Sequence, residues 1–176
     1  MKASIRKLGV ILSVVTVFAV VMPFAASNTC AQQKAANTAE QLIGLWTLVS
    51  VKNEQDGKTT EPFGPNPKGL FIFDRSGRCA LLMFRSDLPK FASNNRDKGT
   101  PEENKAVVQG SLAAFGTYSV NEKEGYFSAR YEAGTFPNHV GIDQKRFFSA
   151  SEDELKITNP SRTVGGTSTL ILKRSR

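Results

Sequence analysis

Few side chains in this sequence of 176 residues could do acid–base or metal chemistry. His139 is the only histidine, and it stands in a Pro–Asn loop with no partner at a fixed spacing. A histidine in such a loop is usually a solvated surface residue, and a role in ligand binding is the alternative. One histidine and the one cysteine, Cys79, that would remain after removal of an N-terminal signal are too few for a metal cluster, and the acidic residues lie in turns. We therefore expect no metal, no other cofactor and no identifiable catalytic residue.

Cys79 offers the only other candidate nucleophile in the body of the chain. It lies in the run RCALLMF between apolar residues, which favours a buried thiol over a reactive one. The sequence contains no G-x-S-x-G, no P-loop and no G-x-G-x-x-G motif. Enzymatic activity is thus uncertain, and the sequence favours a binding role.

Polar side chains within strand-like runs are better candidates for binding. Along residues 141–150 one face carries Ile142, Gln144, Arg146 and Phe148. Burying Gln144 and Arg146 is costly unless they are paired or face a solvated cavity, so this face indicates a polar-decorated pocket. The candidate ligand-binding residues are Tyr118, Arg130, Gln144, Arg146 and His139. The alternative is that Arg130 and Arg146 point outward as ordinary surface cations.

The N-terminus has the organisation of an export signal over residues 1–31. Basic residues precede an apolar run at positions 10–21, and Pro23 ends the run ahead of small residues. Cleavage after Ser27 or after Ala31 satisfies the small-residue rule, and Ala31 is preferred. The mature protein is then periplasmic or extracellular. A retained membrane anchor and a lipid-modified Cys30 are the weaker alternatives, because the apolar run is short and SNTC departs from lipoprotein signals.

The rest of the chain indicates one domain. Residues 32–40 form a polar, alanine-rich lead-in, and residues 41–176 are long enough for one core. Loss of Cys30 with the signal leaves no intrachain disulfide. Removing the three basic residues of the signal lowers the net charge from +7 to +4. The remaining charges lie in mixed-sign clusters, so we expect no nucleic-acid binding and no stable membrane insertion; the oligomeric state stays open.

Short β-like runs alternate with turn residues along this domain. We expect eight strands, at residues 45–51, 69–74, 78–84, 115–120, 125–131, 141–150, 154–158 and 167–173. One helix is expected at 101–114, between the third and fourth strands, opened by Thr100 and Glu103 at the spacing of a capping box. The connection RSDLPKFASNNRDKG before it is either a lid or binding loop or a disordered excursion.

Eight short antiparallel strands must avoid exposed edges. Closing the sheet into a barrel removes its edges, and an eight-stranded barrel is either filled by side chains or holds one small ligand. We therefore predict an all-β, eight-stranded antiparallel barrel.

Several motifs, taken in order, resemble the bacterial and fungal lipocalin-like domain family. They are GLWTLVS, DGK, PFGPNPKG, GTPEE, FGTY, FPNHVGIDQKRFF and LILKR, and they span residues 42–174. The resemblance implies a calycin-type barrel whose base is closed by Gly44 and Trp46, with Arg174 packed across the indole. Such stacking contributes roughly 0.5–2 kcal/mol. His139 departs from the family, in which we expect an aromatic residue there in many relatives.

The resemblance implies a small hydrophobic or amphipathic ligand inside the barrel. The position of Arg146 adds the expectation that this ligand carries an acid or carbonyl group that faces the guanidinium. PFGPNPKG and TFPNHVG are either stiff rims of the barrel mouth or simple strand connections. Two further hypotheses stay open. One is a cofactor-independent isomerase or cyclase acting in the cavity, which needs an acid or base inside. The other is a structural domain with a filled core.

Overall fold

The computed structural model of the protein describes residues 38–162 and 165–175. The predicted signal peptide, both cleavage positions, Cys30 and residues 32–37 of the lead-in lie outside the described residues. Of the predicted lead-in, Thr38 is the N-cap of a short helix, α1 (Ala39–Leu42), and residues 39–40 form its beginning. The backbone N–H of Thr38 donates to Gln41 Oε1 at 3.0 Å, which fixes the first turn of α1.

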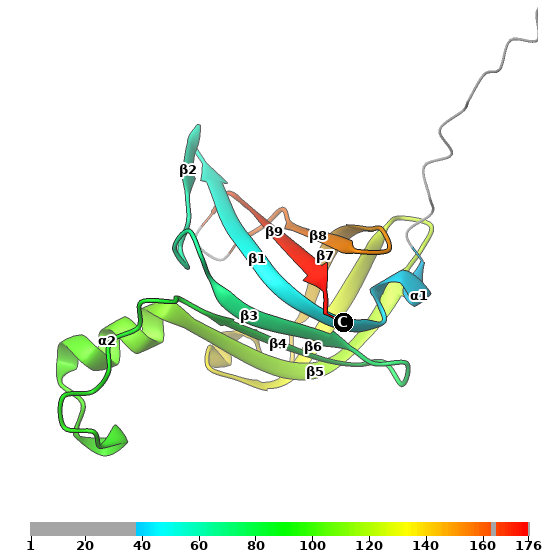
Figure 1. The fold of residues 1–176 in the computed structure, drawn as a ribbon. Coiled ribbons are helices and arrows are strands. Elements are labelled where there is room, and N and C mark those ends of the chain that lie inside the picture. Colours follow the sequence, from blue (N-terminus) through cyan, green and yellow to red (C-terminus); the bar gives the residue numbers. More distant parts are fainter. Residues whose placement is uncertain (1–37, 163–164, 176) are drawn as a thin grey trace, which may run out of the picture. The chain divides into compact units, whose positions relative to one another are not determined.

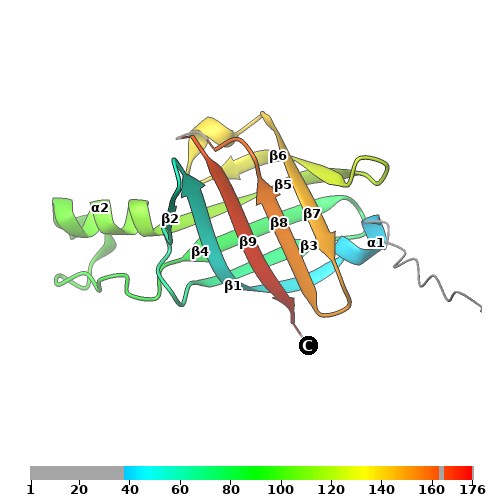
Figure 2. The ribbon, with the colours of Figure 1, turned by 90° about the horizontal axis from the view of Figure 1, so that it is seen from above.

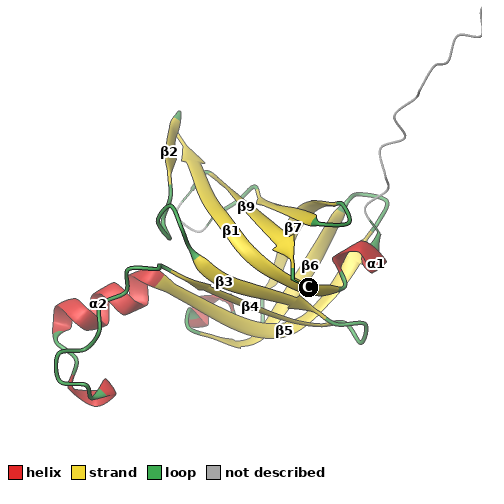
Figure 3. Ribbon diagram, in the orientation of Figure 1, coloured by secondary structure: helices red, strands yellow, loops and turns green. Residues whose placement is uncertain are grey.

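The described chain is dominated by one antiparallel sheet that closes on itself (Figures 1 and 3). Its strands are β1 (Gly44–Gln55), β2 (Lys58–Thr60), β3 (Lys68–Phe73), β4 (Arg78–Phe84), β5 (Ser111–Asn121), β6 (Tyr126–Gly134), β7 (Asp143–Ala150), β8 (Glu154–Asn159) and β9 (Thr167–Arg174). Neighbours follow in sequence order from β3 to β9, and β1 pairs with both β3 and β9. The structure is therefore a closed eight-stranded barrel, as predicted, formed by β1 and β3 to β9.

The short strand β2 was not predicted, and it corrects the position of the helix. It pairs only with the end of β1, through a two-residue hairpin at Asp56 and Gly57. Both residues have positive φ, 50° and 72°, which is the conformation a tight Asp–Gly hairpin requires. With β2 counted, the helix α2 (Pro101–Gly110) lies between β4 and β5, and not between the third and fourth strands.

The predicted helix was also too long at its C-terminal end. Residues 111–114 are extended and pair with residues 81–84 of β4 as the beginning of β5. Gly110 is a poor helix former, and after it the backbone of residues 111–114 pairs with β4 in place of a further helical turn. The start of the helix is as predicted. Glu103 N–H donates to Thr100 Oγ1 at 3.2 Å, and Thr100 N–H donates to Glu103 Oε2 at 2.8 Å.

The loop before α2 folds back onto the helix, and together they extend away from the barrel (Figure 2). The loop contains a short 3-10 helix, η1 (Arg96–Lys98). The carboxylate of Glu103 accepts a further hydrogen bond from Ala92 N–H at 2.8 Å, which ties the loop to the helix. Val108 on α2 is 73% exposed. We call residues 85–110 the arm.

The most deeply buried part of the core lies at the end of the barrel that adjoins α1. Trp46, Leu155 and Leu172 are fully buried there. The ring of Phe73 meets those of Tyr118 and Phe127 edge to face, with centroid separations of 5.1 and 5.2 Å. Edge-to-face contacts between aromatic rings stabilise the folded state beyond the effect of burying the apolar surface of the rings. Within the described residues, no helix has the length and apolar character needed to span a membrane.

Candidate functional site: a cavity behind the barrel mouth

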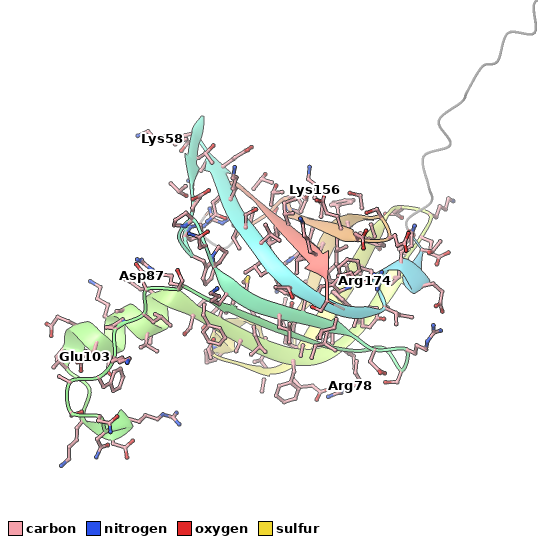
Figure 4. The ribbon with its side chains drawn as sticks, viewed as in Figure 1. Lys58, Arg78, Asp87, Glu103, Lys156 and Arg174 are labelled. Atoms are coloured by element: carbon pink, nitrogen blue, oxygen red, sulfur yellow. The ribbon has the colours of Figure 1, made fainter. Side chains whose placement is uncertain are left out.

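Trp46 closes the barrel at the end that α1 covers. Its side chain is fully buried, and its Nε1–H donates to the Leu42 carbonyl at 2.8 Å. The guanidinium of Arg174, the cross-strand partner of Trp46, lies 4.1 Å from the centroid of the indole. Figure 4 shows Arg174 at this end of the barrel, beside α1. The three residues of the predicted closure are therefore found together, because Gly44 begins the same strand.

Arg174 also holds the backbone around the closure. It donates to the carbonyls of Gln41, Ile43 and Glu152 at 3.1, 2.9 and 2.7 Å. Gly44 has φ of +137°, and a Cβ atom there would lie 2.6 Å from Arg174 Nη1. Only glycine combines this backbone conformation with the close approach of the guanidinium. These contacts assign Gly44, Trp46 and Arg174 a structural role.

A cavity of about 380 Å³ lies behind the opposite end of the barrel. Its mouth is formed by the β2–β3 loop with Pro62 and Phe63, the C-terminal end of α2 with Val108, and the β8–β9 loop. The β6–β7 connection, which contains the 3-10 helix η2 (Pro137–His139), completes it with Phe136 and His139. PFGPNPKG and TFPNHVG thus both contribute to the rim. The volume is in the lower part of the range of small-molecule sites, roughly 300–1,000 Å³.

One wall of the cavity is apolar. It is formed by strands β3 to β6 and consists of Phe71, Leu81, Met83, Leu112 and Phe127. Phe71, Met83 and Phe127 are at most 7% exposed, so this wall belongs to the hydrophobic core. A ligand that covers it gains by removing apolar surface from water, about 25 cal/mol per Å².

The other wall carries a row of polar side chains, which we call the polar arc: Arg146, Asn159, Ser168 and Asn53. They lie on four successive strands, β7, β8, β9 and β1, and all line the cavity. Ser168 is the ladder partner of both Asn159 and Asn53. Arg146 and Asn159 stand one residue beyond the paired residues Phe147 and Thr158. The arc is therefore one continuous level of the barrel wall.

Arg146 is the charged group of the polar arc. It is half-buried, and burial lowers its pKa from the ordinary value, with a smaller opposing effect of Tyr131. Nη2–H donates to Gln144 Oε1 at 2.9 Å and Nη1–H donates to the Lys145 carbonyl at 2.8 Å. Among the described residues it forms no ion pair with a carboxylate. A desolvated cation with spare donors beside an apolar cavity favours an anionic or strongly polar ligand group.

Tyr131 and His139 share the electrostatic environment of Arg146. Burial raises the pKa of Tyr131 to about 12, against a smaller opposing effect of the Arg146 charge, so its hydroxyl stays protonated and can donate. Burial lowers the pKa of His139, and the Arg146 charge lowers it further. His139 also stacks edge to face on Phe136, with centroids 4.7 Å apart.

The barrel and its cavity agree with a match to a known family. The model of the lipocalin-like domain matches residues 43–172, from the beginning of β1 into β9. This chain belongs to the lipocalin-like domain family. The resemblance inferred from the ordered motifs is confirmed. No curated protein matches the chain.

Three of the five candidate ligand residues line the cavity of this lipocalin-like domain: Gln144, Arg146 and His139. The other two, Tyr118 and Arg130, lie outside the cavity lining. Tyr118 is in the packed half of the barrel, where its hydroxyl donates to the Asp74 carbonyl at 3.0 Å. Arg130 points outward and forms an exposed ion pair with Asp143 at 3.4 Å. Arg130 faces outward because successive side chains of a strand alternate between its two faces, and its neighbours Ala129 and Tyr131 are buried inside the barrel.

Asn53 and Ser168 were missed by the sequence analysis. The predicted first strand ended at residue 51, two residues before Asn53. A β-bulge between Leu48 and Ser50 also shifts the alternation, so that Val51 and Asn53 face inward after Trp46 and Leu48. Strict alternation from Trp46 would have placed Asn53 outside. The polar residues of the last strand, Thr167 to Thr169, carry no local signal that selects Ser168.

The residues that line the cavity include few groups for acid–base chemistry. The described residues lining the cavity include no Asp and no Glu. Across residues 38–162 and 165–175, no group of three or more His, Cys, Asp and Glu side chains could hold a metal ion. Cys79 is buried, and burial raises its pKa to about 11, so the thiol is neutral and unreactive at ordinary pH.

Proposed function

We propose that this lipocalin-like domain binds a small, largely apolar molecule inside the barrel, with an acidic group of the ligand facing Arg146. The observation that carries the proposal is Arg146 itself, a half-buried guanidinium without an acidic partner among the described residues, at the edge of an apolar cavity. The protonated hydroxyl of Tyr131, which also lines the cavity and lies within the influence of the Arg146 charge, is a second donor. Export by a signal cleaved after Ser27 or Ala31 is part of the proposal and depends on the sequence alone.

The two alternatives have less support. A filled structural core disagrees with a cavity of about 380 Å³. An isomerase or cyclase needs an acid or base held against the substrate. The described lining residues include no carboxylate, and His139 lies at the mouth beside Phe136. No observation therefore favours catalysis.

The test compares two ligands that differ in charge, decanoate and 1-decanol, by displacement of the neutral fluorescent probe 1-aminoanthracene. Arg146→Met removes the cation and keeps a long side chain. We expect it to weaken decanoate binding by about tenfold to a hundredfold, because hydrogen bonds to charged groups are worth roughly 1.5–3 kcal/mol. Binding of 1-decanol should change little.

Arg130→Met is the matched control, because Arg130 is the arginine of the neighbouring strand that faces outward. It should leave the binding of both ligands unchanged. The proposal is overturned if wild-type protein binds neither ligand, or if Arg146→Met and Arg130→Met weaken decanoate binding equally.

A further inference from the structure

The polar arc contains two buried polar side chains that nothing in the described protein satisfies. Asn53 is 6% exposed and Ser168 is 7% exposed, and they face each other across the β1–β9 ladder. Neither side chain makes a hydrogen bond to a described residue, and both line the cavity. They are not sealed from the cavity, since no described side-chain nitrogen or oxygen is both fully buried and without a partner. The polar atoms of both side chains are therefore accessible from the cavity, where a ligand would bind.

Such groups constrain what can fill the cavity. Buried polar groups are satisfied either by protein or by water, and leaving one unsatisfied costs about 1–3 kcal/mol. When no ligand is bound, water is the partner available to the side chains of Asn53 and Ser168. A ligand that displaces this water with an alkyl surface loses those hydrogen bonds, whereas a ligand with a polar atom at that position replaces them. The pair thus discriminates against a purely apolar chain.

We infer that Asn53 and Ser168 form a second recognition point, so that the ligand carries a hydroxyl, carbonyl or amide group in addition to the acidic group at Arg146. This inference rests on the proposed function. Asn53 supplies both an acceptor and donors, and Ser168 supplies a hydroxyl that can do either. A hydroxyl group on the ligand is the best complement, because it can donate to one of them and accept from the other.

The spacing of the two points defines the ligand further. Arg146 and Asn53 are separated by three strand steps of about 4.7–4.9 Å, which is roughly 14 Å measured along the curved wall and less in a straight line. Asn159, between them, already accepts a hydrogen bond from Ser161 N–H at 3.3 Å. The apolar wall lies opposite. The fitting class is a medium-chain carboxylate with an oxygen function remote from the acid.

The experiment compares decanoate with 8-hydroxyoctanoate, 10-hydroxydecanoate and 12-hydroxydodecanoate in the same displacement assay. We expect at least one of the hydroxy acids to bind wild-type protein about threefold to tenfold more tightly than decanoate, the effect of one net hydrogen bond. Ser168→Ala and Asn53→Leu should each remove most of that preference while decanoate binding persists.

Thr169→Val is the matched control, since Thr169 is the next residue of β9 and does not line the cavity. It should keep the preference. If every hydroxy acid binds no better than decanoate, or if the preference survives both Ser168→Ala and Asn53→Leu, the second recognition point is wrong. In that case the proposed function still holds, provided that decanoate binds and that its binding depends on Arg146. If none of the acids binds, the proposed function fails and the inference fails with it.

Discussion

Arg130 and Arg146 lie on neighbouring strands and face opposite sides of the barrel wall. Arg130 reaches an exposed carboxylate, that of Asp143, and Arg146 reaches the neutral acceptors Gln144 and the Lys145 carbonyl. An exposed ion pair contributes about 0–1 kcal/mol, whereas a desolvated cation has a cost that a bound anion can offset. The environment, and not the residue type, therefore makes Arg146 the candidate for binding.

Arg174 provides the sharpest test of the barrel closure at the scale of one residue. Arg174→Met removes the cation from the indole of Trp46 and leaves three backbone carbonyls without their donor. We expect the free energy of unfolding to fall by about 1–3 kcal/mol, measured by urea unfolding followed by Trp46 fluorescence. Lys173→Met, at the exposed neighbouring position, should change it little. Equal effects of the two substitutions would show that Arg174 does not hold the closure.

The residues of the barrel closure could be predicted from the sequence, whereas the residues that line the cavity could be predicted only in part. Gly44, Trp46 and Arg174 belong to short motifs, so the family resemblance placed them directly. Gln144 and Arg146 were identified because polar residues in a strand stand out from their apolar neighbours. Asn53 could not be identified in this way, because the bulge between Leu48 and Ser50 decides which side of the barrel wall it faces. A bulge changes the facing of every later residue and leaves no reliable local signal.

At the scale of elements, most barrel strands were predictable because alternation and turn residues are local properties. The boundary between α2 and β5 was not. Residues 111–114 continue a helical pattern, yet they pair with β4, and a ladder with a distant strand overrides weak local propensity. The strand β2 was missed for a related reason: it has three exposed residues and pairs only with the end of β1.

Glu103 joins the loop of the arm to its helix through two backbone hydrogen bonds. Glu103→Ala removes the acceptor for Thr100 N–H and Ala92 N–H. We expect faster amide hydrogen exchange in residues 89–110 and unchanged exchange in the barrel, since the arm extends away from it (Figure 2). Glu102→Ala, on the same exposed turn, is the control. Unchanged exchange in Glu103→Ala would mean that the arm is held by other contacts.

Acid should loosen the arm by the same mechanism. Hydrogen bonds from Ala92 N–H and Thr100 N–H lower the pKa of Glu103 below its ordinary value. A carboxyl whose pKa is lower in the folded state stabilises that state above its unfolded pKa, and the contribution is lost as the pH falls through the folded pKa. The tie between loop and helix is therefore present at neutral pH and lost only in acid.

At the scale of the whole molecule, the barrel is divided into a packed half and an open half. Trp46 and Phe73 fill the interior toward α1, and the cavity occupies the interior behind the mouth. The polar arc lies in the open half, beside the cavity. In a sealed core, the side chains of Asn53 and Ser168 would destabilise the fold, because they have no hydrogen-bond partner in the described protein.

The most direct test of this view is to locate a bound ligand by nuclear Overhauser effects between decanoate and the isotope-labelled protein. Phe71 and Ile72 are adjacent residues of β3 that face the inside and the outside of the barrel, at 5% and 38% exposure. We expect contacts from the alkyl chain to Phe71, Leu81 and Met83 on the apolar wall. Contacts to Ile72 and other outward residues alone, or no contacts at all, would contradict binding inside the barrel.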